Sequence, residues 1–538
     1  MQSSTKVTLV NNLSTILQNA GIKQVLYNHL MQTLQLKAIH DLKQIKQCKA
    51  SKIDNPKKII FHCVHGQYFG AIYRELAVAK MLQLKGHRVE VVFCGGKLDS
   101  CTGCFTKDNP PNKGQCKNCI DFSKKFADVV GLPYSTYDDY LRKYPFLPYI
   151  HALRLIELYQ IHIREDNINN VQYKNVKIGT HAQKSTDRYF KGEQPPNENY
   201  LVHKLVDAAT VVDVAEQILL ISKPDIIVTS HSIYAEWGSF SEFFKNYNIP
   251  VYTWFAGNIP GTLVFNFDEL GKDFDTYFNN VRHQQYLTYR EGKELRRLLE
   301  KRKKGYGDTA LYTYTQEEKV FDFSDFQKVY AMFPNVPWDI DSTNRTLFFD
   351  STYKWIDYTI ELFRKHPECL LIIKTHPYER VEKSQKSVYD YVIEKYPDQK
   401  NLVVIPADSE VSSYDLFPYI DAGIVSNSTT GLEMLITGIP VITVGEAHYR
   451  GKGFTYDPKT KKQYEKMLFS KLNITRHSLV STYIYYYFIK SYIPLTFYYR
   501  KNFLNIGWNI KDYEEFLKNK ELNHIANYIL GKEMLQDW

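Results

Sequence analysis

The chain has 538 residues, of which 44% are hydrophobic and 24% charged, and its net charge at pH 7 is +9. This is the composition of a soluble globular protein with room for two or three domains. The positive charge favours acidic partners such as phosphorylated substrates, nucleic acid or an anionic membrane surface, and does not choose among them.

Several classes of protein are excluded at this stage. The N-terminus MQSSTKVTLVNNLSTILQNAG lacks the basic-then-apolar order of a secretory signal. The sequence has no uninterrupted apolar run of about 18 residues, so a membrane span is not expected. Eight cysteines in so long a chain do not suggest a secreted disulfide scaffold. We therefore expect a cytoplasmic protein.

The first half of the chain predicts an α/β domain behind a short extension. Residues 1–57 have helical spacing and are expected to be a peripheral extension. KKIIFHCV (57–64) is the first convincing buried strand, and a glycine-containing turn, a helix and the strand RVEVVFCGG follow it. This order opens a Rossmann-like domain, which we place at 58–285.

Two cysteine pairs interrupt this domain. Cys101 and Cys104 form one CxxC element, and Cys116 and Cys119 form a second one eleven residues later. Four thiolates at this spacing suit tetrahedral Zn²⁺, and four protein ligands leave no open position for catalysis. We expect a structural zinc. An iron–sulfur cluster and four reduced thiols are the alternatives.

A later strand of the same domain, DIIVTS, leads directly into polar residues. It delivers His231 and Glu236 at its carboxyl end, where open α/β sheets bind ligands. Either side chain could take a proton from a hydroxyl group. The alternative interpretation is a hydrogen-bonded structural histidine and a glutamate at a helix start.

The middle of the chain is strongly basic. RHQQYLTYREGKELRRLLEKRKK (282–304) predicts a charged helix, and we place a linker at 286–325. Such runs are typically solvated helix faces, and contact with anionic lipid or a polyanion is the second interpretation.

A second α/β series is predicted at 326–457. Its strands include KVYAMF, CLLIIK and NLVVI, and a helix with Asp350 or Ser351 as its cap follows the first of them. The strand at 369–374 ends in Lys374, His376 and Pro377.

The stretch DAGIVSNSTTGLEMLITGIPVITVG (421–445) then predicts a strand, a polar turn, a helix from about Leu432 to Thr437 and another strand. The turn offers hydroxyls and backbone N–H groups from Ser426, Asn427, Ser428, Thr429, Thr430 and Gly431. Unpaired donors and the positive end of a helix dipole suit a phosphate group, whereas the alternative is an ordinary helix cap. A second polar cluster at a carboxyl end of the same domain favours the ligand site.

The last segment, 458–538, predicts aromatic helices. STYIYYYFIKSYIPLTFYYR is interrupted by Lys490 and Pro494. Helices that pack back onto the protein are therefore favoured over membrane insertion.

Taken in order, these motifs resemble a known family. NVPWD, FDSTYKWIDYTIELF, KTHPYE and SNSTTGLEMLITGIPVITVGEAHYRGKGFTYD resemble the bacterial capsule polysaccharide biosynthesis proteins. These include transferases that add Kdo from a CMP-linked donor. The resemblance is best over 328–457 and does not cover 1–57. It implies an α/β fold of GT-B type, with two Rossmann-like domains facing a cleft and helical extensions at both ends, the C-terminal helices returning toward the first domain.

The resemblance also implies roles for individual residues. His376 would contact the nucleotide or its phosphate, and Ser426, Ser428 and Thr429 match the serine-rich phosphate turn. Glu433 stands where related enzymes place a carboxylate on ribose or sugar hydroxyls, and Tyr449 and Arg450 would border the donor. Lys374 stands where an arginine often precedes the His-Pro pair, which keeps a positive charge but removes the bidentate fork.

The expected function is a glycosyltransferase of capsule or surface polysaccharide synthesis. It would move a sugar from a nucleotide-sugar donor, CMP-Kdo being one candidate, to a glycan or lipid-linked acceptor. No DxD motif stands out in a loop beside the stretch 421–445, so no catalytic metal is expected. We expect no nucleic-acid partner, and peripheral contact with the inner membrane or the export machinery is a further expectation. The alternatives are a nucleotide-sugar epimerase or polyol-phosphate transferase of the same fold, and a non-enzymatic zinc-stabilised polyanion-binding protein.

Overall fold

The structure is a computed structural model of the chain. It describes residues 46, 49–64, 66, 69–101, 113–142, 147–164, 168–191, 198–257, 259, 261–267, 272–282, 285–306, 320–340, 347–382, 384, 386–473, 477–502, 505–510 and 512–538. The expected N-terminal extension therefore lies almost wholly outside the described residues, as does Cys104.

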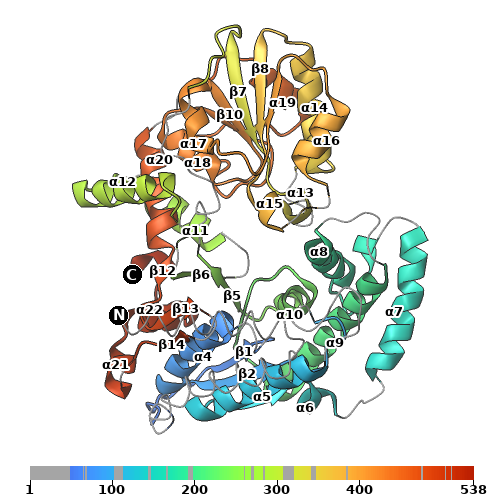
Figure 1. Ribbon diagram of the computed structural model, residues 1–538. Helices are drawn as coiled ribbons and strands as arrows, with labels where there is room; N and C mark the ends of the chain where they lie inside the picture. Colours follow the sequence, from blue (N-terminus) through green and yellow to red (C-terminus); the bar gives the residue numbers. More distant parts are fainter. Residues whose placement is uncertain are drawn as a thin grey trace, which may run out of the picture.

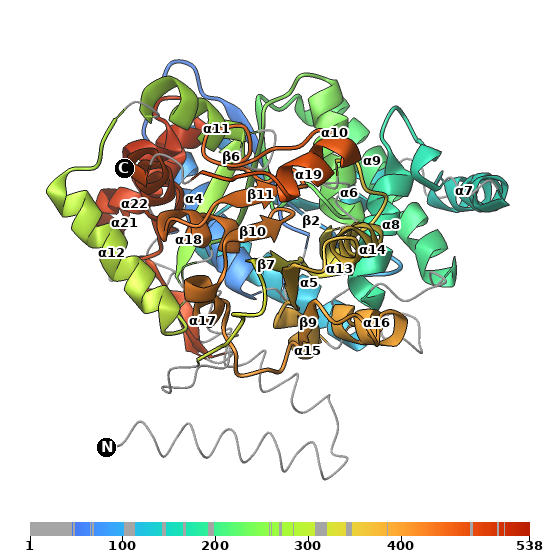
Figure 2. The same cartoon turned by 90° about the horizontal axis from the view of Figure 1, so that it is seen from above.

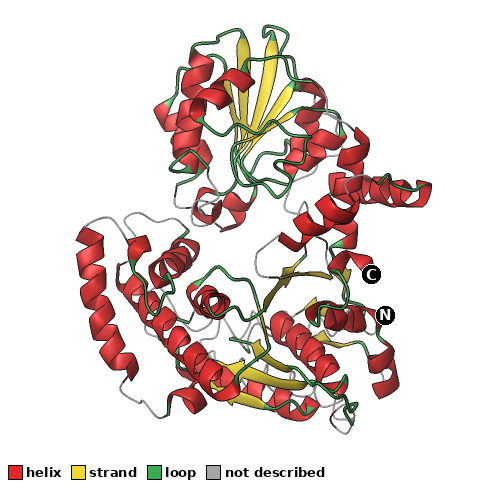
Figure 3. Cartoon of the chain, turned by 180° about the vertical axis from the view of Figure 1, so that it is seen from behind, coloured by secondary structure: helices red, strands yellow, loops and turns green. Residues whose placement is uncertain are grey.

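The strands gather into two separate sheets with helices around each (Figure 3). The first is a seven-stranded sheet of order β12-β6-β5-β4-β1-β2-β3. The strands β1 to β5 pair in parallel, and β6 and β12 are antiparallel additions at one edge. The bounds are β1 (Lys58–His62), β2 (Arg88–Phe93), β3 (Tyr134–Thr136), β4 (Ile226–Thr229), β5 (Val251–Ala256), β6 (Thr262–Phe267) and β12 (Ile493–Pro494).

Helices cover both faces of this first sheet, as near-continuous apolar parallel strands require. One buried cluster includes residues of α4 and α5, and a second packs the opposite face against α8, α9 and α10. The helices of this unit are α4 (Phe69–Leu84), α5 (Lys113–Val130), α6 (Tyr137–Leu141), α7 (Leu147–Arg164), η1 (Ile168–Asn170), α8 (Ile178–Phe190), α9 (Glu198–Ser222), α10 (Ala235–Asn246), α11 (Lys272–Tyr277) and the π-helix η2 (Phe278–Arg282).

The second sheet has five parallel strands in the order β11-β10-β7-β8-β9. One of its faces packs against α14, α16 and α19 through a buried cluster that includes Trp355 and Tyr464. The strands are β7 (Lys328–Phe333), β8 (Cys369–Lys374), β9 (Leu402–Ile405), β10 (Ala422–Val425) and β11 (Val441–Thr443). The helices are α13 (Pro337–Ile340), α14 (Thr352–Arg364), α15 (Tyr378–Glu382), α16 (Val388–Lys395), α17 (Ser413–Leu416), η5 (Phe417–Tyr419), α18 (Thr430–Ile436) and α19 (Lys461–Leu468).

These elements confirm most of the strands predicted for the second unit. The Ser351 hydroxyl accepts the backbone N–H of Lys354 and caps α14, as one of the two predicted cap residues. Residues 347–350, which lead into α14, form no strand. The chain therefore carries two Rossmann-like α/β units in sequence.

Helix α12 (Tyr289–Lys303) lies between the two units in sequence and stands at the edge of the molecule (Figure 2). Thr288 and Glu291 form a capping box at its start. Leu295, Leu298 and Arg302 are buried on its inner side, whereas most of its other cations are exposed. The expected solvated helix is thus only partly solvated.

The C-terminal segment returns to the first unit. Strand β12 pairs with β6, and the Trp508 indole N–H donates to the Tyr73 carbonyl 2.7 Å away. Alongside the expected helices it contains a strand hairpin. The elements are α20 (His477–Tyr485), the π-helix η6 (Tyr486–Lys490), β13 (Tyr498–Asn502), β14 (Asn505–Trp508), α21 (Tyr513–Lys518), α22 (Lys520–Ile529) and η7 (Leu535–Asp537). Among the described helices, none is long and apolar enough to cross a membrane.

Candidate functional site

Strand order locates the ligand-binding edge of each sheet before any side chain is considered. In the second sheet the chain runs from β7 to β8 and β9 on one side, then crosses to β10 and β11 on the other. In the first sheet the same reversal occurs between β1 and β4. Open parallel sheets bind ligands outside the carboxyl ends of the strands at this reversal. Figure 1 shows α13 and α15, which follow β7 and β8, on the side of the second unit that faces the first.

The His-Pro pair follows β8 at this edge. Lys374, the last residue of the strand, is buried, and His376 is half-buried. The His376 Nδ1 atom accepts the backbone N–H of Tyr378 at 3.1 Å. The neutral imidazole therefore carries its proton on Nε2, which is the nitrogen that can donate to a ligand.

The serine turn follows β10, next to β7. The Ser426 side chain is only 2% exposed, and its hydroxyl has no hydrogen-bond partner among the described residues. The buried Oδ1 atom of Asn427 also has no hydrogen-bond partner among the described residues. The backbone N–H of Asn427 donates to the Asn335 side chain at 3.4 Å. Because Asn335 follows β7, this contact lies at the strand reversal. Buried polar atoms without partners are rare in proteins, and a missing ligand is one explanation for them.

The start of α18 differs from the open phosphate turn expected from the sequence. The Thr430 N–H donates to the Ser428 hydroxyl at 3.3 Å, and the Gly431 N–H donates to the Ser428 carbonyl at 3.1 Å. Thr429 occupies the N-cap position without a side-chain cap. Two of the amides expected to be open are thus already used inside the turn, so its remaining polar groups matter more for ligand binding.

Tyr449 supports this turn from within the protein. Its ring is fully buried, and its hydroxyl donates to the Ser428 carbonyl at 2.5 Å. A Cβ atom at Gly431 would lie 2.2 Å from the Tyr449 hydroxyl oxygen, so this close approach requires glycine. The structure therefore places Tyr449 behind the turn as a support.

Arg450 and Glu433 are also engaged with other parts of the protein. The Arg450 guanidinium donates to the carbonyls of Thr443 and Pro458. Glu433 is 5% exposed and lies 2.8 Å from Arg302 of α12. Their roles at a donor remain predictions, and their observed contacts are structural.

Two cations of the first unit reach α13, the short helix that follows β7. The Trp338 ring lies 4.9 Å from the Arg188 guanidinium carbon and 5.1 Å from Lys191 Nζ. The Trp338 indole N–H donates to the Ser384 hydroxyl at 2.9 Å, in the segment after β8. These contacts join the first unit to the edge that carries His376.

In the first unit, His231 follows β4 at the strand reversal. It is half-buried, and the rings of Tyr234 and Trp237 pack edge-on against it with centroids 4.9 and 4.7 Å away. Glu236 is 1% exposed and forms a buried ion pair with Lys204. His231 is thus the better placed of the two predicted bases, and both assignments remain predictions.

Sequence reasoning passed over several residues at these edges. His62 ends β1, hydrogen-bonds the Tyr137 hydroxyl at 2.5 Å and stacks on Phe240 at 3.7 Å. Asn335 comes shortly after a buried strand, a signal that could have found it. Its proximity to Asn427 depends on the pairing of β7 with β10, which the sequence pattern does not give.

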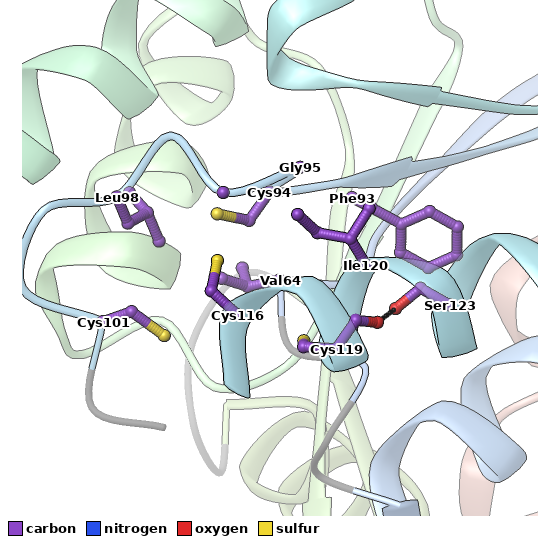
Figure 4. Close-up of a pocket in the computed structure, with 11 residues that line it drawn as sticks. Val64, Phe93, Cys94, Gly95, Leu98, Cys101, Cys116, Cys119, Ile120 and Ser123 are labelled. Atoms are coloured by element: carbon purple, nitrogen blue, oxygen red, sulfur yellow. Dashed lines mark hydrogen bonds between the residues drawn. The ribbon is translucent and has the colours of Figure 1, made fainter. Parts of the chain in front are cut away.

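Three of the four predicted zinc ligands are described. Cys101 lies in the loop after β2, and Cys116 and Cys119 lie on α5, so the second CxxC is helical. They line one cavity of about 30 Å³ together with Cys94 (Figure 4). Within the described ranges, no three His, Cys, Asp or Glu side chains already form a metal-binding group. The zinc site stays a prediction.

Comparison with known proteins finds a family model that matches part of the chain. Residues 341–498 match the family described as capsule polysaccharide biosynthesis protein. The predicted resemblance to this family is confirmed. The matched segment covers the His-Pro pair and the serine turn. No curated protein matches the chain.

Solved structures add only distant likenesses. The β-Kdo 2,4 transferase of Thermosulfurimonas dismutans KpsC is 14% identical at a TM-score of 0.36, covering 49% of this chain and 79% of its own. The β-Kdo 2,7 transferase of the same protein is 18% identical at 0.29, covering 50% and 78%. The UDP-GlcNAc 2-epimerase of Methanocaldococcus jannaschii is 11% identical at 0.26, covering 79% and 98%. Likenesses this distant carry no argument about activity.

Proposed function

We propose that the chain is a glycosyltransferase of GT-B type in capsule or surface polysaccharide synthesis. It would move a sugar from a nucleotide-sugar donor to a glycan or lipid-linked acceptor. One observation carries the proposal: the buried Ser426 hydroxyl, which has no partner in the part of the chain that the structure describes, lies at the strand reversal of the unit that carries the family match. His376 follows the strand on the other side of β7.

The donor side would work by charge stabilisation. Departure of a nucleotide leaves negative charge on phosphate oxygens, and preorganised donors lower the barrier for that step. His376 through Nε2, Ser426 through its hydroxyl and Lys374 through its charge are the candidates. Because these groups can stabilise the leaving phosphate, we propose a reaction that needs no divalent metal. CMP-Kdo is one candidate donor.

On the acceptor side, His231 would take the proton from the attacking hydroxyl. It follows β4 at the strand reversal of the first sheet, where a ligand of that unit is expected. Glu236 remains the second candidate, although release from Lys204 would be needed before it could act as a base. His231→Gln should therefore reduce turnover strongly while leaving nucleotide binding unchanged.

The test is a thermal shift with CMP, UMP, GMP and the corresponding nucleotide sugars. We expect at least one to raise the Tm of the full-length protein and His376→Ala to abolish that rise. His366→Ala is the matched control, because His366 lies in the same unit but stacks on Phe469. Absence of a shift with every nucleotide would overturn the proposal.

Product analysis then separates glycosyl transfer from other reactions of nucleotide sugars. Incubation with and without a glycan acceptor should give a glycosylated product only when the acceptor is present. Conversion of the donor without acceptor would identify an epimerase. Phosphate retained in the product would identify a polyol-phosphate transferase.

We propose α12 as the surface for peripheral contact with an anionic membrane. Tyr286 and Tyr289 near its start are 78% and 82% exposed. The exposed acidic side chains of this segment are Glu294 and Glu300, and its exposed cations are Arg290, Lys293, Arg296, Arg297, Lys301, Lys303 and Lys304. A basic surface of this kind is attracted to anionic lipid at about 1 kcal/mol per cation near the surface.

Vesicle sedimentation tests this surface. The protein should bind vesicles that contain anionic lipid and not neutral ones, and Arg296→Glu with Arg297→Glu should weaken binding. Lys462→Glu with Lys466→Glu changes the same charge on exposed positions of α19 and should have little effect. Equal loss in both double variants would mean that net charge alone attracts the protein.

A further inference from the structure

Cys94 belongs to neither CxxC pair, yet it lines the same cavity as three of their cysteines. It directly follows β2, and the cavity walls also include Cys101, Cys116 and Cys119 (Figure 4). The thiols come from a strand end, a loop and a helix. Their gathering is therefore a property of the fold and does not follow from sequence spacing.

A tight turn follows Cys94 and forms part of the cavity wall. Gly95 and Gly96 have φ angles of +64° and +85°, which favour glycine. The Lys97 N–H donates to the Cys94 carbonyl at 3.4 Å and closes the turn. Gly95, Gly96 and Leu98 line the cavity beside Cys94, so the turn fixes this cysteine at the cavity wall.

The other walls of the cavity fit a single small cation. Cys94 and Cys101 are 8% and 9% exposed, and apolar side chains such as Val64 and Leu98 complete the lining. The volume of about 30 Å³ exceeds the roughly 10–15 Å³ that one water-sized sphere needs. A thiolate that is buried among these side chains needs a neighbouring positive charge.

Two features of the fold place the other three cysteines near Cys94. Cys116 and Cys119 are three residues apart on α5 and so share one helix face. The loop that carries Cys101 is fixed by Asp207, which accepts the Ser100 N–H at 3.1 Å and the Ser100 hydroxyl at 2.5 Å.

We propose that Cys94, in place of the Cys104 predicted from the sequence, is a thiolate ligand of a structural Zn²⁺ bound in this cavity with Cys101, Cys116 and Cys119. Zinc takes four thiolates at about 2.3 Å in a closed tetrahedron. The four side chains line the cavity without yet surrounding one point, so binding requires them to rotate and to release their protons. The bound metal would fasten α5 and the loop after β2 to the carboxyl edge of the first sheet. This inference is independent of the proposed transferase activity.

The test measures metal on the full-length protein. Wild type should hold one zinc per chain by elemental analysis, and Co²⁺ substitution should give an intense sulfur-to-metal absorption band. Cys94→Ser should weaken zinc binding at least about tenfold and reduce this band. Cys369→Ser, a buried cysteine of the second unit, should leave both unchanged. Cys94→His retains a ligand and should bind Co²⁺ with one fewer thiolate in the spectrum.

A second measurement keeps the assignment testable if Cys94→Ser fails to fold. Zinc should protect Cys94 of the wild type from alkylation relative to chelator-treated protein, while the buried Cys63 is modified equally in both. An unchanged spectrum in Cys94→Ser, or equal alkylation of Cys94 with and without zinc, would overturn the proposal. So would visible absorption of an iron–sulfur cluster in anaerobically purified protein.

Discussion

The Nε atom of Arg302 lies 2.8 Å from a carboxylate oxygen of Glu433, and the two side chains are 1% and 6% exposed. The same oxygen accepts the Tyr414 hydroxyl at 2.6 Å, and the Arg302 guanidinium lies over the Phe488 ring at 4.6 Å. The pair ties α12 to α18, the helix that follows the serine turn. Glu433, which the family resemblance predicts to bind the donor, is thus held in a buried ion pair between α18 and α12.

Removal of one member of this pair should be costly, because the other charge would stay buried without its partner. We expect Arg302→Met to lower the free energy of unfolding by about 3–5 kcal/mol, measured by urea denaturation. Glu433→Gln should destabilise in the same direction. The double variant Arg302→Met with Glu433→Leu should be less destabilised than the sum of the single variants, since it removes both charges.

The Glu433 variant also separates two roles. If Glu433 acts only through Arg302, Glu433→Gln will lower Tm but keep the shift caused by the nucleotide. A retained Tm together with a lost nucleotide shift would contradict the structural role and favour the donor contact predicted from the sequence.

Gly431 provides a test of the support behind the serine turn. A Cβ atom there would lie 2.2 Å from the Tyr449 hydroxyl and 2.9 Å from its ring carbon. Gly431→Ala should therefore cost about 1–3 kcal/mol through overpacking. Tyr449→Phe removes the hydroxyl and should recover part of that loss in the double variant.

The matched control for this substitution is Gly292→Ala. Gly292 lies in α12 and has open space around its missing Cβ. Alanine favours helices over glycine, so this variant should be neutral or more stable by about 0.5–1 kcal/mol. Equal destabilisation of the two variants would contradict the clash at Tyr449.

Substitution of Ser426 should change the stability of the protein and its nucleotide binding in opposite directions. Its buried hydroxyl has no partner among the described residues, so Ser426→Ala should leave the ligand-free protein as stable or up to about 1 kcal/mol more stable. If the hydroxyl binds phosphate, the same change should reduce the nucleotide-induced rise in Tm. Calorimetry with and without the nucleotide measures both.

Ser239 is the control for this experiment. It is fully buried in the first unit, and its hydroxyl likewise has no partner among the described residues. Ser239→Ala should leave the nucleotide shift unchanged. A full nucleotide shift in Ser426→Ala would remove Ser426 from the site.

The sequence predicted those features that local patterns determine. The strand at 369–374 is an uninterrupted apolar run that is buried along its whole length, and the Ser351 cap follows from the capping preference of serine. The burial of Arg302 was not predictable in this way, because a cation in a basic run is usually solvated. Packing of α20 against α12, together with the Glu433 carboxylate and the Phe488 ring, removes it from water.

The candidate site shows the same division. His376 and the serine turn were found because each directly follows a buried strand. The contact between Asn427 and Asn335 depends on the pairing of β10 with β7, which are far apart in sequence. Cys94 belongs to neither CxxC pair, so the cysteine spacing does not indicate it as a ligand. Its place in the cavity depends on how α5 packs against the end of β2.

Glu379, close after the His-Pro pair, predicts a pH dependence of stability. Its side chain is 3% exposed and accepts the Val388 N–H at 3.2 Å. Burial raises the pKa of this carboxyl to about 7, opposed by the Val388 hydrogen bond and reinforced by Asp390. The folded protein therefore keeps the proton at pH values where the unfolded chain has lost it. The stability from this group is complete below the ordinary glutamate pKa and is lost as pH rises to about 7.

Glu379→Gln removes the ionisation and keeps an acceptor for the Val388 N–H. The Tm of the variant minus that of wild type should therefore rise between about pH 5 and pH 7 and level off above. Differential scanning calorimetry across this range measures the difference. Glu361→Gln makes the same substitution on the exposed side of α14 and is the control. A constant difference for Glu379→Gln would mean that the carboxyl ionises normally in the folded protein.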